Sequence, residues 1–453
     1  MKEFLVKESS TIKQCLLGID QNEYGIIFII NTNDEVIGVA TDGDIRSHLL
    51  KGANLEDPII GVYNPNFIWA NTETKREAIL KRLDKDIKAI PMLDKNRKLI
   101  DVVTRDYIPI NSEKKIFTRS RAPVRITFSG GGSDLTHYFS SQDGAVINTT
   151  ISLYSHASLK IRDDKRIKIH SLDLGDIFEA NNLQEALEKG NDFALFKSLL
   201  KAIKPNFGFD LLVYSDFPMG SGLGGSSVVS AAVLGCFNEL RQDKWDLYEI
   251  SELAFQAERL HMEISGGWQD QYATVFGGFN FMEFRSGSNI INPLRISKDT
   301  ILELEESLLL FRASEDRLLE GDVIHKKQKK DMQSQDVRNK VKSAVNICYE
   351  MKDHLLKNRL LHFGELLDKA WKLKRKFSSD ISNPKLDNIY QHAISHGALG
   401  GKLLGAGGGG YFIFFVKPFD KLKLIEAMKN IGLYHTPFQF DHDGMKSWSV
   451  RDE

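Results

Sequence analysis

The segment FGFDLLVYSDFPMGSGLGGSSVVSAAVLGCFNEL (207–240) carries the strongest structural signal in this sequence. Its alternating apolar residues predict a strand over 209–214, and the small and apolar residues of 226–240 predict a helix. The loop between them is rich in glycine and serine. Glycine lets the backbone approach a ligand closely, and the start of the following helix offers unpaired N–H groups and the positive end of its dipole. The loop is therefore predicted to bind an anion, most simply phosphate.

Two common glycine-rich motifs and a plain turn fit this loop less well. Gly220, Gly222 and Gly225 have the spacing of a dinucleotide fingerprint, but that motif needs an acidic ribose ligand about 20 residues further on. Position 240 instead ends the predicted helix. A Walker A loop is excluded because no Lys followed by Ser or Thr comes after the glycines. A plain strand-to-helix turn would not account for so many glycines and serines.

Two further motifs, in a fixed order with this loop, resemble those of the GHMP kinase superfamily (galactokinase, homoserine kinase, mevalonate kinase and phosphomevalonate kinase). RAPVRITFSGGGSDL (121–135) is similar to the substrate-side first motif, and KLLGAGGGGY (402–411) to the C-terminal glycine motif. The resemblance spans 121–415. It implies an α+β, two-lobed kinase fold, with a ribosomal-protein-S5-like N-terminal lobe and a ferredoxin-like C-terminal lobe. It also implies ATP and Mg²⁺ as cofactors.

The same resemblance assigns catalytic roles. Asp270 is expected to be the catalytic acid/base beside the acceptor hydroxyl, and Arg125 its cationic partner or a group that stabilises the transferring phosphoryl. Glu258 and a loop serine, Ser226 in preference to Ser227, are expected to hold Mg²⁺. Taken alone, such a Glu is usually solvated and such an Asp usually a helix cap. The expected ATP-binding residues are Pro218, Gly220, Ser221, Gly222, Leu223, Gly224, Gly225, Ser226 and Ser227.

Substrate contacts are expected from the first and third motifs. Asp134 follows a glycine triplet, and its carboxylate suits sugar hydroxyls, although it would also serve as the N-cap of a helix from Leu135. A tight turn between two strands is the alternative for the glycines of the third motif. The expected substrate-binding residues are Asp134, Gly131, Gly132, Ser133, Lys402, Gly407 and Gly408.

Within the superfamily, residues 130–159 and SGGWQDQYA (265–273) are most similar to the heptose 7-phosphate kinases. That resemblance implies phosphorylation of the anomeric hydroxyl of D-glycero-D-manno-heptose 7-phosphate to the 1,7-bisphosphate, for nucleotide-heptose and surface-polysaccharide synthesis. The basic run 372–379 is a candidate for the distal phosphate, or a solvated helix end. The alternatives are another sugar 1-kinase, acting on fucose or a uronic acid, and an inactive nucleotide sensor, against which the intact catalytic set argues.

The first hundred residues contain a weak repeat, FIINTNDEVIGVATDGDI (28–45) and IPMLDKNRKLIDVVTRDYI (90–108), with a period of about 60 residues. The repeat resembles a tandem α/β pair of cystathionine-β-synthase-type (CBS) domains. In such pairs, residues like Thr41 and Asp44 bind the ribose of a regulatory adenine nucleotide. In the second copy Tyr107 stands in place of the Asp, so at most one such nucleotide site is expected. The alternatives are a simple helix cap at Thr41 and a module that mediates a homodimer.

Composition and charge narrow the function classes. The net charge of −1 shows no basic excess of the kind that nucleic-acid-binding proteins usually have. The sequence has no apolar run of about 18 residues, so no membrane partner is expected. Three distant cysteines (15, 236 and 348) without metal spacing favour a reducing, cytoplasmic setting. The expected domains are a CBS-type pair (1–110), a linker (111–120), a first kinase lobe (121–300) and a second kinase lobe (301–453).

Overall fold

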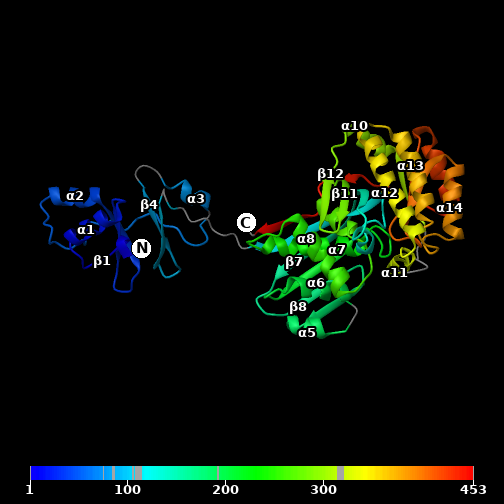
Figure 1. Cartoon of the computed structure of the whole chain (residues 1–453). Helices are drawn as coiled ribbons and strands as arrows, with labels where there is room; N and C mark the ends of the chain where they lie inside the picture. Colours follow the sequence, from blue (N-terminus) through cyan, green and yellow to red (C-terminus); the bar gives the residue numbers. More distant parts are fainter. Residues whose placement is uncertain are drawn as a thin grey trace. The chain divides into compact units, whose positions relative to one another are not determined.

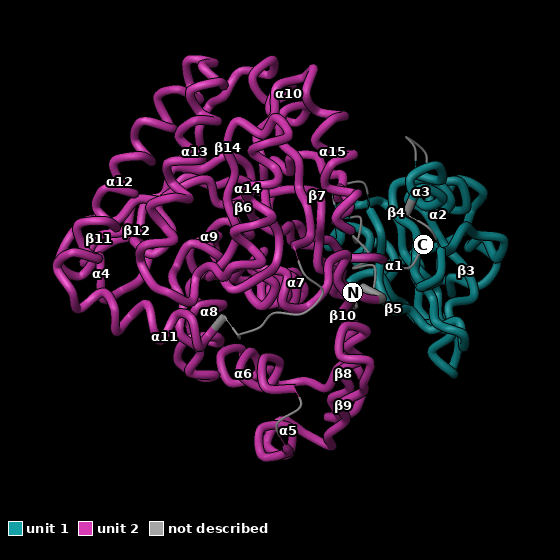
Figure 2. Tube along the Cα trace, turned by 90° about the vertical axis from the view of Figure 1, so that its right-hand side faces the viewer, with its two compact units in different colours: residues 1–113 teal, residues 114–453 magenta. Residues whose placement is uncertain are grey.

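The computed structural model describes residues 2–74, 76–83, 87–104, 107, 115–190, 193–313 and 321–451. The chain divides into two compact units, 1–113 and 114–453, drawn in teal and magenta in Figure 2. None of the described helices has the length and apolar character that a bilayer span requires. The three cysteines are buried and unpaired.

The first unit contains two small sheets. Three strands form the sheet β1-β2-β3, in which β1 is parallel and β3 antiparallel to β2, and β4 and β5 form an antiparallel pair. The described part of each half of the predicted repeat thus contains an antiparallel hairpin, β2–β3 in the first half and β4–β5 in the second. The elements are η1 (Lys2–Phe4), β1 (Leu5–Lys7), α1 (Ile12–Asn22), β2 (Ile26–Ile30), β3 (Val36–Thr41), α2 (Asp42–Leu50), α3 (Arg76–Leu80), β4 (Ala89–Leu93) and β5 (Leu99–Thr104).

The predicted nucleotide residues of this unit form a helix cap. Thr41 Oγ1 donates to Asp44 Oδ2 at 2.7 Å, and Thr41 N donates to the same oxygen at 2.9 Å. Asp44 N donates in return to Thr41 Oγ1 at 3.1 Å. This reciprocal pattern is a capping box, which satisfies orphan N–H groups at the start of α2.

The second unit has two lobes, each built on its own sheet. The first lobe has a nine-stranded sheet whose long strand β7 pairs with β6, β10, β11 and β17. Helices α7 and α9 pack against β6 and β7 and cover the apolar core. The strands are β6 (Lys115–Ser129), β7 (Gly144–Ile161), β8 (Ile167–Ser171), β9 (Asp176–Ala180), β10 (Phe209–Ser215), β11 (Phe279–Arg285), β12 (Ser288–Pro293), β17 (Phe440–Asp441) and β18 (Lys446–Arg451). The helices are α4 (Thr136–Phe139), α5 (Leu183–Glu188), α6 (Ala194–Ile203), α7 (Gly225–Leu240), α8 (Leu247–Phe255) and α9 (Gln269–Phe276), with the π-helical turn η3 (Gln256–His261).

The second lobe has a four-stranded sheet in the order β14-β15-β13-β16. Helices α13 and α14 contact β14, and α12 packs on α13; Figure 1 shows these helices in yellow to orange. The strands are β13 (Leu308–Arg312), β14 (Ala398–Leu403), β15 (Tyr411–Val416) and β16 (His435–Thr436). The helices are α10 (Lys298–Ser307), α11 (Gly321–Asp331), α12 (Gln335–Leu356), α13 (Leu360–Lys374), α14 (Pro384–Ser395), α15 (Lys421–Asn430) and the short η4 (Pro418–Asp420).

Two predicted boundaries need correction. Strands β17 and β18 pair with β7 and β6, so the end of the chain completes the first lobe's sheet and does not belong to a second lobe of 301–453. Residues 115–120 of the predicted linker are the start of β6, because β7 and β18 supply hydrogen-bonding partners on both of its sides. The rest of that linker, 111–114, lies outside the described residues.

Candidate active site

The predicted phosphate loop, residues 217–227, follows β10 and includes the first turn of α7; it opens onto a cavity of about 480 Å³. Gly220, Gly222 and Gly224 have φ values of +72°, +79° and +84°, which only glycine adopts at little cost. The loop residues that line the cavity are Phe217, Met219, Gly220, Ser221, Gly222, Gly224, Gly225 and Ser226. The cavity lining does not include three of the predicted ATP-binding residues, Pro218, Leu223 and Ser227. The side chains of Leu223 and Ser227 are buried.

Part of the lining of this cavity is apolar. It includes Leu174, Phe193, Phe196, Val229 and Met262. Helix α7 begins at Gly225, which also lines the cavity, after the N-cap Gly224, which provides no side-chain cap for the first N–H groups of the helix. One cavity thus joins an apolar wall to a helix N-terminus suited to an anion.

Glu258 accepts hydrogen bonds from both candidate serines. Ser226 Oγ donates to Glu258 Oε2 at 2.7 Å, and Ser227 Oγ donates to the same oxygen at 3.2 Å. Gln271 Nε2 donates to the other carboxylate oxygen at 3.2 Å, and Arg259 Nη1 lies 3.6 Å from Oε2. Glu258 lies in η3 and is fully buried. Its hydrogen bonds with the two serines hold its carboxylate at the start of α7.

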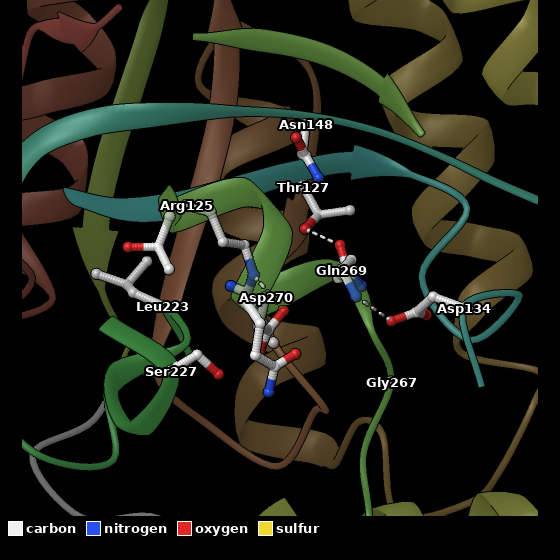
Figure 3. A network of polar contacts seen from close by, with 12 residues as sticks. Arg125, Thr127, Asp134, Asn148, Leu223, Ser227, Gly267, Gln269 and Asp270 are labelled. Atoms are coloured by element: carbon white, nitrogen blue, oxygen red, sulfur yellow. Dashed lines mark hydrogen bonds and ion pairs between the residues drawn. The ribbon is translucent and has the colours of Figure 1, made fainter. Parts of the chain in front are cut away.

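Arg125 and Asp270 form a bidentate ion pair, drawn with dashed lines in Figure 3. Arg125 Nε lies 2.8 Å from Asp270 Oδ1 and Nη2 lies 2.9 Å from Oδ2. The third guanidinium nitrogen, Nη1, donates to the Gly222 carbonyl at 2.8 Å and so ties the pair to the phosphate loop. Burial alone would raise the pKa of Asp270, but the charge and hydrogen bonds of Arg125 outweigh it and lower that pKa, with Arg259 contributing in the same direction.

A smaller cavity of about 30 Å³ adjoins the large one. Its lining is mostly polar, and it includes Thr127, Gly131, Gly132, Asp134, Gln269 and Lys374. The residues that line both cavities are Arg125, Asp270, His325, Gly405 and Ala406. The Arg125–Asp270 pair therefore stands in the wall between the two cavities.

Asp134 is buried in the small cavity and held by backbone groups. Its Oδ1 accepts from Gly132 N at 2.9 Å and its Oδ2 from Gln269 N at 3.3 Å. A Cβ on Gly267 would lie 1.8 Å from Asp134 Oδ2, so this approach requires glycine. Burial, followed by the charge of Asp270, raises the pKa of Asp134. The two neighbouring carboxyl groups are thus shifted in opposite directions, a pattern typical of acid–base sites.

Four predicted substrate residues line neither cavity. Ser133 Oγ binds the backbone carbonyls of Gly130 and Ala145. Lys402 Nζ donates to the Thr127 carbonyl at 2.7 Å in the buried interior, and burial together with Lys374 lowers its pKa well below the usual value. Gly407 and Gly408 pack on the backbone of Ile381; of the third motif, only Gly405 and Ala406 reach the cavities.

The basic run 372–379 divides into different environments. Lys372 pairs with Asp368 on α13, and Arg375 pairs with Asp387 on α14. Lys374 is buried, donates to the Gly405 carbonyl and lines the small cavity. Only this member of the run stands beside the candidate substrate site.

Several cavity residues lie outside the sequence prediction. Gln269 directly precedes Asp270 in the sequence. This position next to the predicted base was the one signal that could have marked Gln269 as a site residue. His325 comes from α11, and its Nδ1 has no hydrogen-bond partner among the described residues. Burial and the charge of Arg259 lower the pKa of His325 to about 4. Arg259 follows Glu258 and lines the large cavity.

Comparison with known proteins places the second unit in a family. Residues 193–278 match the model of the GHMP kinases N terminal domain, and residues 351–432 match the GHMP kinases C terminal model. The D-glycero-alpha-D-manno-heptose 7-phosphate kinase of Campylobacter jejuni is 38% identical over 339 residues, which cover 73% of this chain and 99% of that protein. This chain belongs to the GHMP kinases.

Further GHMP kinases are also similar. A crystal structure described as a D-glycero-D-manno-heptose 1-phosphate kinase from Bacteriodes thetaiotaomicron superposes with a TM-score of 0.62 at 30% identity, covering 74% of this chain and 100% of that one. The bifunctional fucokinase/GDP-fucose pyrophosphorylase of Arabidopsis thaliana is 27% identical over 68% of this chain and 30% of its own length. Both matched family models lie in the second unit of this GHMP kinase.

The Arg125–Asp270 pair predicts a pH-dependent stability in this GHMP kinase. Arg125→Gln leaves Asp270 buried without its cation, which costs about 3–5 kcal/mol at pH 7. Arg125 lowers the pKa of Asp270 in the folded wild type, so Asp270 stays ionised there over this pH range. In Arg125→Gln burial raises the pKa of Asp270, so the folded variant takes up a proton as the pH falls and loses the penalty of the buried charge. Urea unfolding of the wild type and Arg125→Gln at pH 7 and pH 4.5 should show a smaller difference in unfolding free energy between them at pH 4.5. An equal difference at both pH values would contradict this electrostatic account.

Proposed function

We propose that this GHMP kinase transfers the γ-phosphoryl group of ATP to the anomeric hydroxyl of D-glycero-D-manno-heptose 7-phosphate, as a step in nucleotide-heptose synthesis. The observation that carries the proposal is the position of Asp270, whose pKa Arg125 lowers, in the wall shared by a large cavity and a small polar cavity. The similarity to the Campylobacter jejuni heptose 7-phosphate kinase supports the choice of acceptor.

We expect ATP to bind in the large cavity. The phosphates would lie on the loop 220–227 at the N-terminus of α7, where free N–H groups and the helix dipole favour negative charge. The base would lie against the apolar part of the lining, which includes Phe193 and Met262. This orientation directs the γ-phosphate toward Arg125 and Asp270.

Glu258 and Ser226 would hold Mg²⁺ beside the phosphates. The donor set fits the ion, since Mg²⁺ prefers oxygen ligands and commonly takes one or two protein ligands together with substrate phosphates. Among the described residues no group of three or more His, Cys, Asp and Glu side chains forms a complete metal cage, which agrees with a shared site. When bound, the ion would neutralise charge on the transferring phosphates.

The chain's own residues then perform the transfer. Asp270, ionised because of Arg125, orients the acceptor hydroxyl and accepts its proton. The acceptor oxygen forms a bond to the γ-phosphorus while the bond from that phosphorus to the β–γ bridging oxygen breaks, and ADP leaves. Arg125 and Arg259 place positive charge where negative charge develops. Asp134 would bind a sugar hydroxyl in the small cavity.

Fucose is the alternative acceptor, because the bifunctional fucokinase/GDP-fucose pyrophosphorylase of Arabidopsis thaliana is also similar. The buried Lys374 beside the small cavity favours a phosphorylated sugar, since a neutral acceptor has no need of that cation.

The direct test is ADP release from Mg-ATP with a panel of heptose 7-phosphate, mannose 6-phosphate, mannose, fucose, galactose and glucuronate. Turnover should be confined to the heptose phosphate. Asp270→Asn should lower kcat by about 10²- to 10⁴-fold, because the side chain keeps its shape but loses the proton acceptor. ATP binding should persist in the variant. Efficient turnover of fucose would replace the acceptor, and an unchanged kcat in Asp270→Asn would remove the proposed base.

The two serines provide a matched test of the metal site. Ser226 is exposed at the cavity, whereas Ser227 is buried and lines neither cavity. Ser226→Ala should therefore raise the Mg²⁺ concentration needed for half-maximal activity by about tenfold or more, and Ser227→Ala should raise it less. A Mg²⁺ titration of both variants at saturating ATP compares them. A larger effect of Ser227→Ala would move the metal ligand to that residue.

For the first unit we propose a CBS-type module that binds an adenine nucleotide near Thr41 and Asp44. Its two hairpins and the exposed Asp44 carboxylate support this role. A regulatory ligand must bind two activity states with different affinity. AMP, ADP and ATP titrations should therefore change the kinetics of the full chain, and Asp44→Ala should reduce the response. The same response in wild type and Asp44→Ala would leave these two residues only their role as a helix cap.

A further inference from the structure

The side chain of Gln269 lies in the small cavity with its orientation fixed by Thr127. Thr127, on β6, donates from Oγ1 to Gln269 Oε1 at 2.7 Å, as Figure 3 shows. Both residues are buried, Thr127 at 4% and Gln269 at 8% exposed. Because this bond uses the amide oxygen, the two N–H groups of Nε2 remain available as hydrogen-bond donors. No hydrogen-bond partner for Nε2 exists among the described residues.

The amide nitrogen of Gln269 lies beside Gly131 in the lining of the small cavity. Nε2 lies 3.7 Å from the position that a Cβ on Gly131 would occupy, and both residues line the cavity. The backbone N of Gln269 holds Asp134 Oδ2, and the next residue is Asp270. A hydrogen-bond donor, an acceptor carboxylate and the proposed base therefore belong to one small group of side chains.

Thr127 is itself rigidly placed. It lies in the paired part of β6 opposite Asn148 of β7, and its carbonyl accepts from the buried Lys402 Nζ at 2.7 Å. A residue locked in this way can select one of the two orientations of a glutamine amide. The uncharged N–H groups of that amide suit a neutral oxygen, and the cations Arg125 and Lys374 beside them suit phosphate oxygens.

We propose that Gln269 is a specificity-determining residue whose Nε2 donates a hydrogen bond to the acceptor hydroxyl adjacent to the one that is phosphorylated. For a sugar 1-kinase this is the hydroxyl on C2. Thr127 is the positioning residue that keeps Nε2, and not Oε1, directed toward that hydroxyl. The inference rests on the proposed function for the anomeric position, and it applies to any sugar acceptor that the enzyme turns over.

The test uses the full chain with the panel sugar that the wild type turns over best, so that a wrong choice of heptose phosphate does not affect it. Gln269→Met keeps the length of the side chain and removes its donors. The KM for the sugar should rise about three- to tenfold, the effect of one neutral hydrogen bond, with the KM for ATP unchanged. An unchanged sugar KM, or an equal rise for ATP, would overturn the proposal.

The 2-deoxy form of the same sugar identifies the hydroxyl. Wild type should lose about as much kcat/KM on the deoxy sugar as Gln269→Met loses on the parent sugar, and the two losses should not add. Additive losses would overturn the assignment to C2.

Thr127 variants test its positioning role. Thr127→Val should reproduce part of the rise in sugar KM, Thr127→Ser should restore the wild-type value, and Thr127→Val should add nothing in the Gln269→Met background. An effect of Thr127→Val that persists in that background would show a structural role unrelated to the amide.

Discussion

The bidentate ion pair between Arg125 and Asp270 is the interaction on which the rest of the site depends. It joins strand β6 to helix α9 across 145 positions of sequence, and the remaining guanidinium nitrogen binds the Gly222 carbonyl of the phosphate loop. A single buried cation thus fixes the distance between the proposed base and the loop that would hold ATP. Without that cation, burial would raise the pKa of the Asp270 carboxyl and disfavour the ionised form that accepts a proton.

The environment of this pair shifts the pKa values of two neighbouring carboxyl groups in opposite directions. The pKa of Asp134 is raised because burial disfavours its charge and the negative Asp270 lies nearby, whereas Arg125 lowers the pKa of Asp270. Burial and the charge of Arg259 lower the pKa of His325 to about 4. Arg259 adds positive charge to the lining of the large cavity. Carboxyl groups of different pKa beside several cations suit phosphoryl transfer to a hydroxyl.

Sequence reasoning predicted the parts that motifs encode locally. The two-lobed α+β fold and the glycine-rich loop followed from three ordered motifs. Of the predicted catalytic and metal residues, Arg125, Ser226 and Asp270 line the large cavity, whereas Glu258 is fully buried and reaches it only through its hydrogen bond from Ser226. The features that sequence reasoning missed depend on contacts between distant segments of the chain. Strand β18 completes the first lobe's sheet from the far end of the chain, and α11 delivers His325 without any motif. Lys402 looked like a substrate ligand, but only the packed structure shows its amine bound to a carbonyl of β6.

A crystal structure with a non-hydrolysable ATP analogue, Mn²⁺ and heptose 7-phosphate would test the central claim most directly, because Mn²⁺ is located by its anomalous scattering. The account predicts the γ-phosphate on the loop 220–227 and the anomeric hydroxyl at about 2.6–3.2 Å from an Asp270 carboxylate oxygen. It also predicts Mn²⁺ between Glu258 and the phosphates. An acceptor bound with its anomeric hydroxyl away from Asp270, or a nucleotide with its phosphates outside this loop, would contradict it.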